Sequence, residues 1–109
     1  MSHEASEMSG TIDEKRRRLL ACIDRVLIKL GPNVRRALTY HMRREYELKR
    51  YEIPDKPQEF CMALARVFGK AAAGIEYQMI QLIVDEFHLE PETKLSLERV
   101  IQIVLSDKK

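Results

Sequence analysis

Glycines and prolines divide this sequence into segments of helical length. The breaks fall at Gly31-Pro32, Pro54, Pro57, Gly69 and Pro91. Proline cannot continue the interior of a helix, and glycine readily adopts the positive φ angles that end one. Between the breaks, apolar residues recur three or four positions apart, and no stretch alternates with the period of a strand. The sequence therefore predicts an all-α protein: a compact five-helix single domain with short Gly/Pro linkers over residues 11–106, preceded by a flexible N-terminal tail over 1–10.

Each predicted helix has its own start and stop signals. The first is expected to follow a capping box that begins at Thr11 and to end at Gly31. The second begins at Pro32 and frays between Glu47 and Tyr51, ahead of the proline pair. The other three are expected over 57–68, 70–89 and 92–106, and 71–74, rich in small residues, is expected to let another helix approach closely. The predicted buried sides are Leu19, Leu20, Ile23, Val26, Leu27, Leu30; Val34, Ala37, Leu38, Met42, Tyr46; Phe60, Ala63, Leu64, Val67, Phe68; Ile75, Met79, Leu82, Ile83, Phe87; and Leu97, Val100, Ile101, Val104.

Composition places the chain among globular proteins. Of its 109 residues, 45% are hydrophobic and 33% are charged, a balance unlike that of disordered chains. No apolar run is long enough to cross a membrane, and residues 1–10 lack the basic and apolar regions of a secretory signal. We therefore expect no membrane partner and a cytoplasmic location. In that setting Cys22 and Cys61 are expected to be reduced residues on the apolar sides of their helices.

Positive charge is concentrated in the first half of the sequence. From Lys15 to Arg50 there are twelve Lys or Arg residues against three acids. Arg36, Arg43 and Arg50 recur every seven residues, which would align them along one edge of a continuous helix. Because the second helix is expected to fray before Tyr51, the secure part of this edge is Arg36 and Arg43. The run 15–18 is expected to spread around its own helix as a solvated surface, its repulsion relieved by Asp13, Glu14 and Asp24.

The basic side chains of the second helix are the candidate site. The predicted partner-binding surface consists of Arg35, Arg36, Tyr40, Arg43, Arg44 and Arg50. Such a surface predicts a non-enzymatic helical interaction module, regulatory or signal-output in role, with an acidic protein as its partner. The alternative is a nucleic-acid-binding protein that uses the same face, with the tyrosine ring stacking on a base or ribose. A homodimer through Ile80, Val84 and Leu105 is a third, weaker hypothesis.

Catalytic and metal-binding patterns do not appear in the sequence. The histidines, His3, His41 and His88, are far apart, and there is no HExxH, Cys/His cluster or paired-carboxylate signature. Asp85 and Glu86 lie beside His88, but their position at a helix end is typical of solvated residues. No GxGxxG or Walker loop is present, so neither catalytic residues nor a cofactor or metal are expected. His41 is expected to be partly buried and hydrogen-bonded.

The turn at residues 30–33 admits two descriptions. A helix-turn-helix would place Asn33, Arg35, Arg36 and Thr39 against bases. Pro32 in the turn and the length of both helices fit that motif poorly. A simple helical hairpin is therefore the favoured interpretation.

The segment from Ile53 to Ala72 resembles a known family. The string "IPDKPQEFCMALARVFGKAAAGIE" is similar to the fifth type of the archaeal Nitrosopumilus output domains, and "LGPNVRRALTYHMRREYEL" is similar to the helix that this family places upstream. The matching residues are Ile53, Pro54, Pro57, Phe60, Leu64, Phe68, Gly69 and Ala72. The resemblance covers roughly residues 20–90 and implies a small helical signal-output module. It supplies no catalytic or ligand-binding residue.

Overall fold

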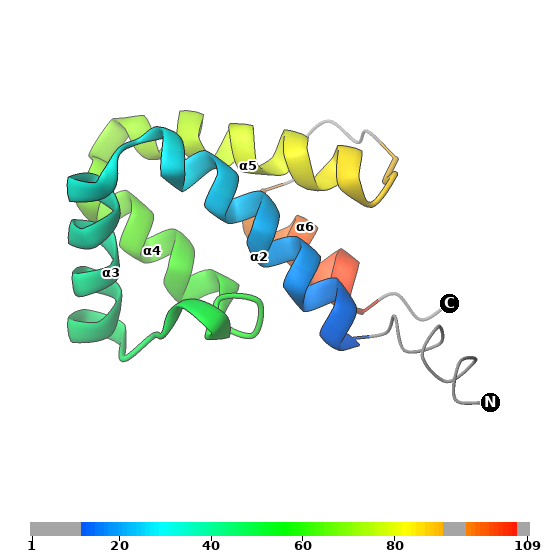
Figure 1. Cartoon of the computed structure of the whole chain (residues 1–109), viewed down its shortest axis with the longest axis horizontal. Helices are drawn as coiled ribbons and strands as arrows, with labels where there is room; N and C mark the ends of the chain where they lie inside the picture. Colours follow the sequence, from blue (N-terminus) through cyan, green and yellow to red (C-terminus); the bar gives the residue numbers. More distant parts are fainter. Residues whose placement is uncertain (1–11, 91–95, 107–109) are drawn as a thin grey trace.

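The breaks at Gly31-Pro32, Pro57 and Gly69 become helix boundaries in the computed structural model, which describes residues 12–90 and 96–106 (Figure 1). Pro54 lies in a turn, and Pro91 lies outside the described residues. The predicted all-α class is confirmed, because the described residues form five α-helices and two short 3-10 helices. The N-terminal tail and the capping box at Thr11 lie outside the described residues. In chain order the elements are α2 (Ile12–Lys29), α3 (Pro32–Tyr46), η1 (Arg50–Glu52), α4 (Pro57–Phe68), η2 (Gly69–Ala71), α5 (Ala72–Glu86) and α6 (Leu97–Leu105).

Two glycines end helices with backbone conformations that other residues avoid. Gly31, between α2 and α3, has φ 97° and ψ 156°, and Gly69, after α4, has φ 57°. A side chain at such angles meets its own backbone, so glycine is required for conformational reasons. The following elements then start at once, α3 with Pro32 in its first turn and η2 with Gly69 itself.

Helix α3 ends with its C-cap at Glu47, where the range in which it was expected to fray begins. Glu47 takes the left-handed conformation with φ 49°, and its N–H donates to the Arg43 carbonyl at 3.1 Å. The bond from Glu47 to Arg43 is that of an αL-type cap, and the N–H of Leu48 donates to the Met42 carbonyl at 3.0 Å. This cap turns Leu48 into the core, where it is fully buried. The helix therefore stops four residues before Arg50.

Helix α4 lies at the centre of the packing. Its Phe60, Ala63 and Leu64 are fully buried, and it packs against α3, α5 and α6, while α2 packs along α5. Every buried side chain among the described residues is apolar, apart from the thiol of Cys22. At the molecular scale, α3 stands at one end of the protein, and the first turn of α2 and the last turn of α6 lie toward the other (Figure 1).

Several expectations of the sequence analysis are corrected. Helix α3 packs mainly on α4, so the expected helical hairpin of α2 and α3 is wrong. Ala37 was expected on the buried side of its helix, but it is exposed. Of the small residues at 71–74, Ala72 is buried in the core, whereas Gly74 has open space around the position of a Cβ and is not a point of close approach. Helix α6 starts at Leu97 rather than 92, since the Ser96 hydroxyl accepts a hydrogen bond from the Arg99 N–H at 3.1 Å. Helix α5 ends at Glu86 rather than 89.

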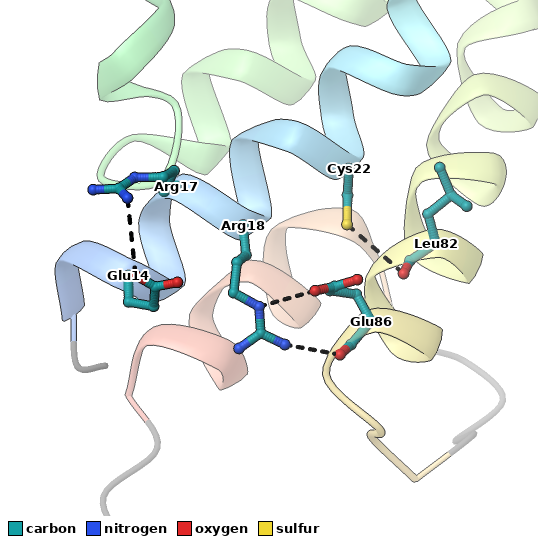
Figure 2. Close-up of polar contacts among 6 residues, drawn as sticks. All are labelled: Glu14, Arg17, Arg18, Cys22, Leu82 and Glu86. Carbon is teal, nitrogen blue, oxygen red and sulfur yellow. Dashed lines mark hydrogen bonds and ion pairs between the residues drawn. The ribbon is translucent and has the colours of Figure 1, made fainter. Parts of the chain in front are cut away.

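Both cysteines are free thiols, as expected. Cys22 is buried, with its Sγ 3.8 Å from the Leu82 carbonyl oxygen (Figure 2), and Cys61 is half-buried. Burial raises the pKa of Cys61 to about 12, with Glu76 and Glu98 contributing in the same direction through their charge. Burial also raises the pKa of Cys22. Neither thiol is therefore disposed to react as a thiolate.

The cysteine environments predict slow thiol modification in the folded protein. With Ellman's reagent at about pH 8, both thiols should react at least about tenfold more slowly in the native state than in urea. The native rate should still rise with pH above about 9, where the rate for unfolded cysteine levels off, because the thiolate of Cys61 forms only near its raised pKa. Rapid native reaction at pH 8 would contradict the raised pKa values.

Two glycines predict opposite effects of the same substitution. Gly31→Ala should lower the free energy of unfolding by about 1–3 kcal/mol, because alanine is strained at φ 97° and ψ 156°. Gly74→Ala should raise it by about 0.5–1 kcal/mol, because Gly74 lies inside α5 with open space for a methyl group. Urea unfolding followed by circular dichroism measures both changes. Equal signs for the two variants would contradict this assignment.

Candidate docking surface

Three arginines of the basic block are engaged in tertiary ion pairs. Arg18 on α2 donates from Nε to Glu86 Oε2 at 2.9 Å and from Nη2 to the Glu86 carbonyl at 3.1 Å, and its guanidinium lies 4.6 Å from the ring centroid of Phe87. Figure 2 shows this bridge from α2 to the end of α5. Arg16 is paired with Asp55 and also donates to the Tyr51 carbonyl at 3.0 Å. These contacts join α2 to the last turn of α5 and to the turn at Pro54.

Arg50 makes the third pair. Its Nε donates to Asp24 Oδ1 at 3.1 Å while its Nη2 contacts Oδ2, so the guanidinium binds the Asp24 carboxylate of α2 in a bidentate manner. The hydrogen bond with Asp24 raises the pKa of Arg50, and that with Asp55 raises the pKa of Arg16. Arg50 thus lies in η1, outside α3, and does not continue the edge of Arg36 and Arg43. Of the predicted site residues, it alone is bound to a carboxylate of another element.

Asp13, Glu14 and Asp24 were expected to relieve the repulsion among residues 15–18. Two arginines of this run, Arg16 and Arg18, instead pair with acids of other elements. Arg17 pairs within its own helix, with Glu14 at 3.9 Å (Figure 2). Asp24 neutralises Arg50 instead of the run. Glu86, a residue of the group near His88 that was considered for metal binding, is the partner of Arg18. Within residues 12–90 and 96–106, no cluster of three His, Cys, Asp or Glu side chains is arranged to hold a metal ion.

Four other arginines of the block lie together on the outer face of α3. Arg35, Arg36, Arg43 and Arg44 are exposed, and so are Thr39 and Tyr40; the buried side of the helix carries Leu38 and Met42. No acid occurs between Pro32 and Arg44, and Glu45 is the first one. In the part of the chain that the structure describes, no carboxylate pairs with any of these four arginines. We call Arg35, Arg36, Thr39, Tyr40, Arg43 and Arg44 the α3 face.

Tyr40 forms a ridge in the middle of the α3 face. Tyr40 is 61% exposed, similar to Tyr51 and Tyr77. Its hydroxyl accepts a hydrogen bond from Arg44 Nη1 at 3.0 Å, and the Arg44 guanidinium lies 5.9 Å from the ring centroid. Arg44 therefore contacts Tyr40 through both its hydroxyl and its ring.

Open hollows lie on both sides of this ridge. One, of about 430 Å³, is lined by Pro32, Arg35, Arg36, Thr39 and Tyr40. The other, of about 480 Å³, is lined by Tyr40, Arg43 and Arg44. Each hollow combines guanidinium groups with one side of the tyrosine. Because both are wide open to solvent, they suit side chains of a macromolecule better than an enclosed small molecule.

His41 differs from its expected environment. It is half-buried as predicted, but its Nε2 is buried with no hydrogen-bond partner among the described residues. The residue is next to Tyr40 in sequence, yet it is less exposed than that ring and lines neither hollow of the α3 face. His41 is therefore not part of the candidate surface.

The apolar residues considered for a dimer interface are partly used by the fold. Ile80 and Leu105 pack against the hydrophobic core, and Val84 is half-buried.

None of the helices in the described ranges is both long enough and apolar enough to span a bilayer.

The division between paired and free arginines predicts different effects on stability. Arg18→Gln should lower the free energy of unfolding by about 1 kcal/mol, because it removes a salt bridge and a cation–π contact that join α2 to α5. Arg43→Gln, the matched control, should change it by less than about 0.5 kcal/mol. Urea unfolding at low salt measures both values. A loss for Arg43→Gln as large as that for Arg18→Gln would show that the α3 face is part of the stabilising network.

Comparison with known proteins identifies no relative on which function could be based. The chain matches no protein-family model, and neither the curated proteins nor the solved structures contain a significant match.

Proposed function

We propose that this protein is a non-enzymatic helical interaction module that docks an acidic protein partner through the α3 face. The observation that carries the proposal is the segregation of its arginines. Arg16, Arg18 and Arg50 are neutralised by carboxylates of the same chain, whereas Arg35, Arg36, Arg43 and Arg44 are left together on one acid-free helix face. Like charges held together on a surface repel one another, so a partner that supplies negative charge relieves a cost already present.

A regulatory, signal-output role is the biological setting that we propose for this docking. It rests on the resemblance of the Ile53–Ala72 segment to the archaeal output-domain family. In the structure, most residues that carry this resemblance serve the fold. Ile53, Pro54, Pro57, Phe60, Leu64 and Ala72 are buried, while Phe68 is half-buried and Gly69 ends α4. The resemblance therefore bears on the scaffold, and the α3 face is the part that we expect to carry the specific function.

A nucleic-acid-binding protein is the second candidate function. It is favoured by the exposed ring of Tyr40, which lies between guanidinium groups and next to the Thr39 hydroxyl, a combination that can hold phosphates and stack on a base. Against it, the net charge is only +2, and three arginines of the basic block already form ion pairs with carboxylates of the same chain. The number of cations free to meet phosphates is therefore small.

The proposed function predicts charge-dependent binding that maps to α3. Fluorescent polyglutamate of about 20 residues should bind at about 50 mM salt and more weakly at about 150 mM, since exposed charges are screened. The Arg36→Glu, Arg43→Glu double variant should weaken binding by about tenfold or more. The matched control is Arg66→Glu, Arg99→Glu, which makes the same charge change on exposed positions of α4 and α6.

The same titration separates the two candidates. Single-stranded and duplex oligonucleotides of similar charge are titrated alongside polyglutamate with each variant. Oligonucleotide binding that survives at about 150 mM salt and is lost only in the α3 variant would favour the nucleic-acid function. Polyglutamate binding that is indifferent to the α3 variant, or equally sensitive to the control variant, would overturn the proposed docking surface.

A further inference from the structure

The α3 face has a spacing that selects among acidic partners. Arg36 and Arg43 are seven residues apart on a regular helix, so their Cα atoms are separated by about 10.5 Å along the axis and lie on nearly the same line. Tyr40 stands between them, and a hollow opens on each side of its ring. The face therefore presents two arginines whose backbone positions are two helical turns apart, on either side of an aromatic ridge.

From this geometry we infer that the partner segment is an α-helix with a stripe of carboxylates, packed along α3 with acids seven residues apart facing Arg36 and Arg43. The inference rests on the proposed function and names the form of its partner. A second helix repeats the same spacing of about 10.5 Å between residues i and i+7 on one face. Smaller residues between the acids leave a groove for Tyr40, as in ridge-into-groove packing of helices.

Other forms of polyanion match the α3 face less well. Residues on one side of an extended strand recur every 6.6 Å or so, and twice that distance is about 13 Å, so a strand matches the Cα spacing of Arg36 and Arg43 less closely than a second helix does. Sites for single-stranded nucleic acid stack successive bases on several aromatic rings. On α3, whose residues are all described, Tyr40 is the one aromatic ring that is largely exposed, since Tyr46 is half-buried. The helical partner is therefore the one that the spacing favours.

The position of α3 in the molecule leaves room for a partner helix. Helix α3 stands at one end of the protein and packs on α4 with its inner side, so its outer side is not covered by another element of the described chain (Figure 1). The hydrogen bond of 3.0 Å from Arg44 restricts the Tyr40 side chain on this open side. A ring with fewer accessible orientations costs less entropy to use in binding than a freely rotating one.

The test uses two helical peptides of identical composition. Both are alanine-rich, about 21 residues long and capped for helix formation, and both carry five glutamates and three lysines. In the stripe peptide the glutamates recur at three- and four-residue intervals on one face, and in the scattered peptide they are distributed around the helix. Binding is followed by chemical-shift perturbation in the ¹⁵N-labelled protein, and a single-stranded oligodeoxythymidine is titrated in parallel.

The stripe peptide should bind about fivefold more tightly than the scattered peptide, which corresponds to two additional exposed ion pairs. Its largest shifts should fall on the amides around Arg36, Tyr40 and Arg43. The preference should disappear in the Arg36→Gln, Arg43→Gln variant and persist in Arg66→Gln, Arg99→Gln. Tyr40→Ala should reduce the preference without abolishing binding, because it removes the ridge and leaves the four arginines in place.

The outcomes distinguish this inference from the proposed function. Equal binding of both peptides, lost in Arg36→Gln, Arg43→Gln, would overturn the helical partner and leave docking through the α3 face intact. Binding of neither peptide, or binding indifferent to that variant, would overturn both. Tighter binding of the oligonucleotide than of the stripe peptide, with shifts centred on Tyr40, would replace the protein partner with nucleic acid.

Discussion

The burial of apolar side chains by helix α4 is the interaction on which the rest of the structure depends. Phe60, Ala63 and Leu64 are fully buried and meet residues of α3, α5 and α6. Because α4 has helices on several sides, its packing fixes where α3 can lie and which side of α3 faces outward. Burying Phe60 alone is worth a few kcal/mol, comparable with a large part of the net stability of a small domain. The α3 face therefore owes its position to a core that contains none of its residues.

Because the core is apolar, the charged side chains lie at the surface. Two groups of arginines there differ in whether they pair with a carboxylate of the same chain. Arg16, Arg18 and Arg50 reach across to acids that are 26 to 68 residues away and bind them at the junctions of α2 with α5 and with the proline turn. Among the described residues, no carboxylate forms an ion pair with the arginines of α3. Surface pairs contribute little to stability individually, so their main consequence is to define which cations remain for a partner.

Much of the fold could be predicted from local signals in the sequence. Pro32, Pro57 and Gly69 gave the boundaries of α3 and α4, because the restrictions on proline and glycine act within one or two residues. The inward positions of α6 were correct for the same reason, since helical periodicity is local. Leu48 and Ile53 were missed although both are buried, because they lie in an irregular segment that has no periodicity to reveal them.

The candidate site was only partly predictable. Arg35, Arg36, Tyr40, Arg43 and Arg44 follow from their spacing on one helix, and the structure places all five on its exposed face. The pairing of Arg50 with Asp24 depends on how the proline turn folds back on α2, and no local rule describes that contact. The packing of α3 on α4 rather than on α2 is also a tertiary choice. The Arg43-to-Arg50 interval resembled a continuing helix, and the left-handed residue at Glu47 is what ends it.

The placement of α3 at one end of the protein has a consequence for how the molecule could work as a component of something larger. The first turn of α2 and the last turn of α6 lie toward the end opposite α3 (Figure 1). A tether, tag or neighbouring domain attached at the start of α2 or at the end of α6 would join the molecule at the end away from the arginines of α3 and from Tyr40. The two ends of the molecule can then serve different tasks, one for attachment and the other for recognition, and they need not compete for the same surface.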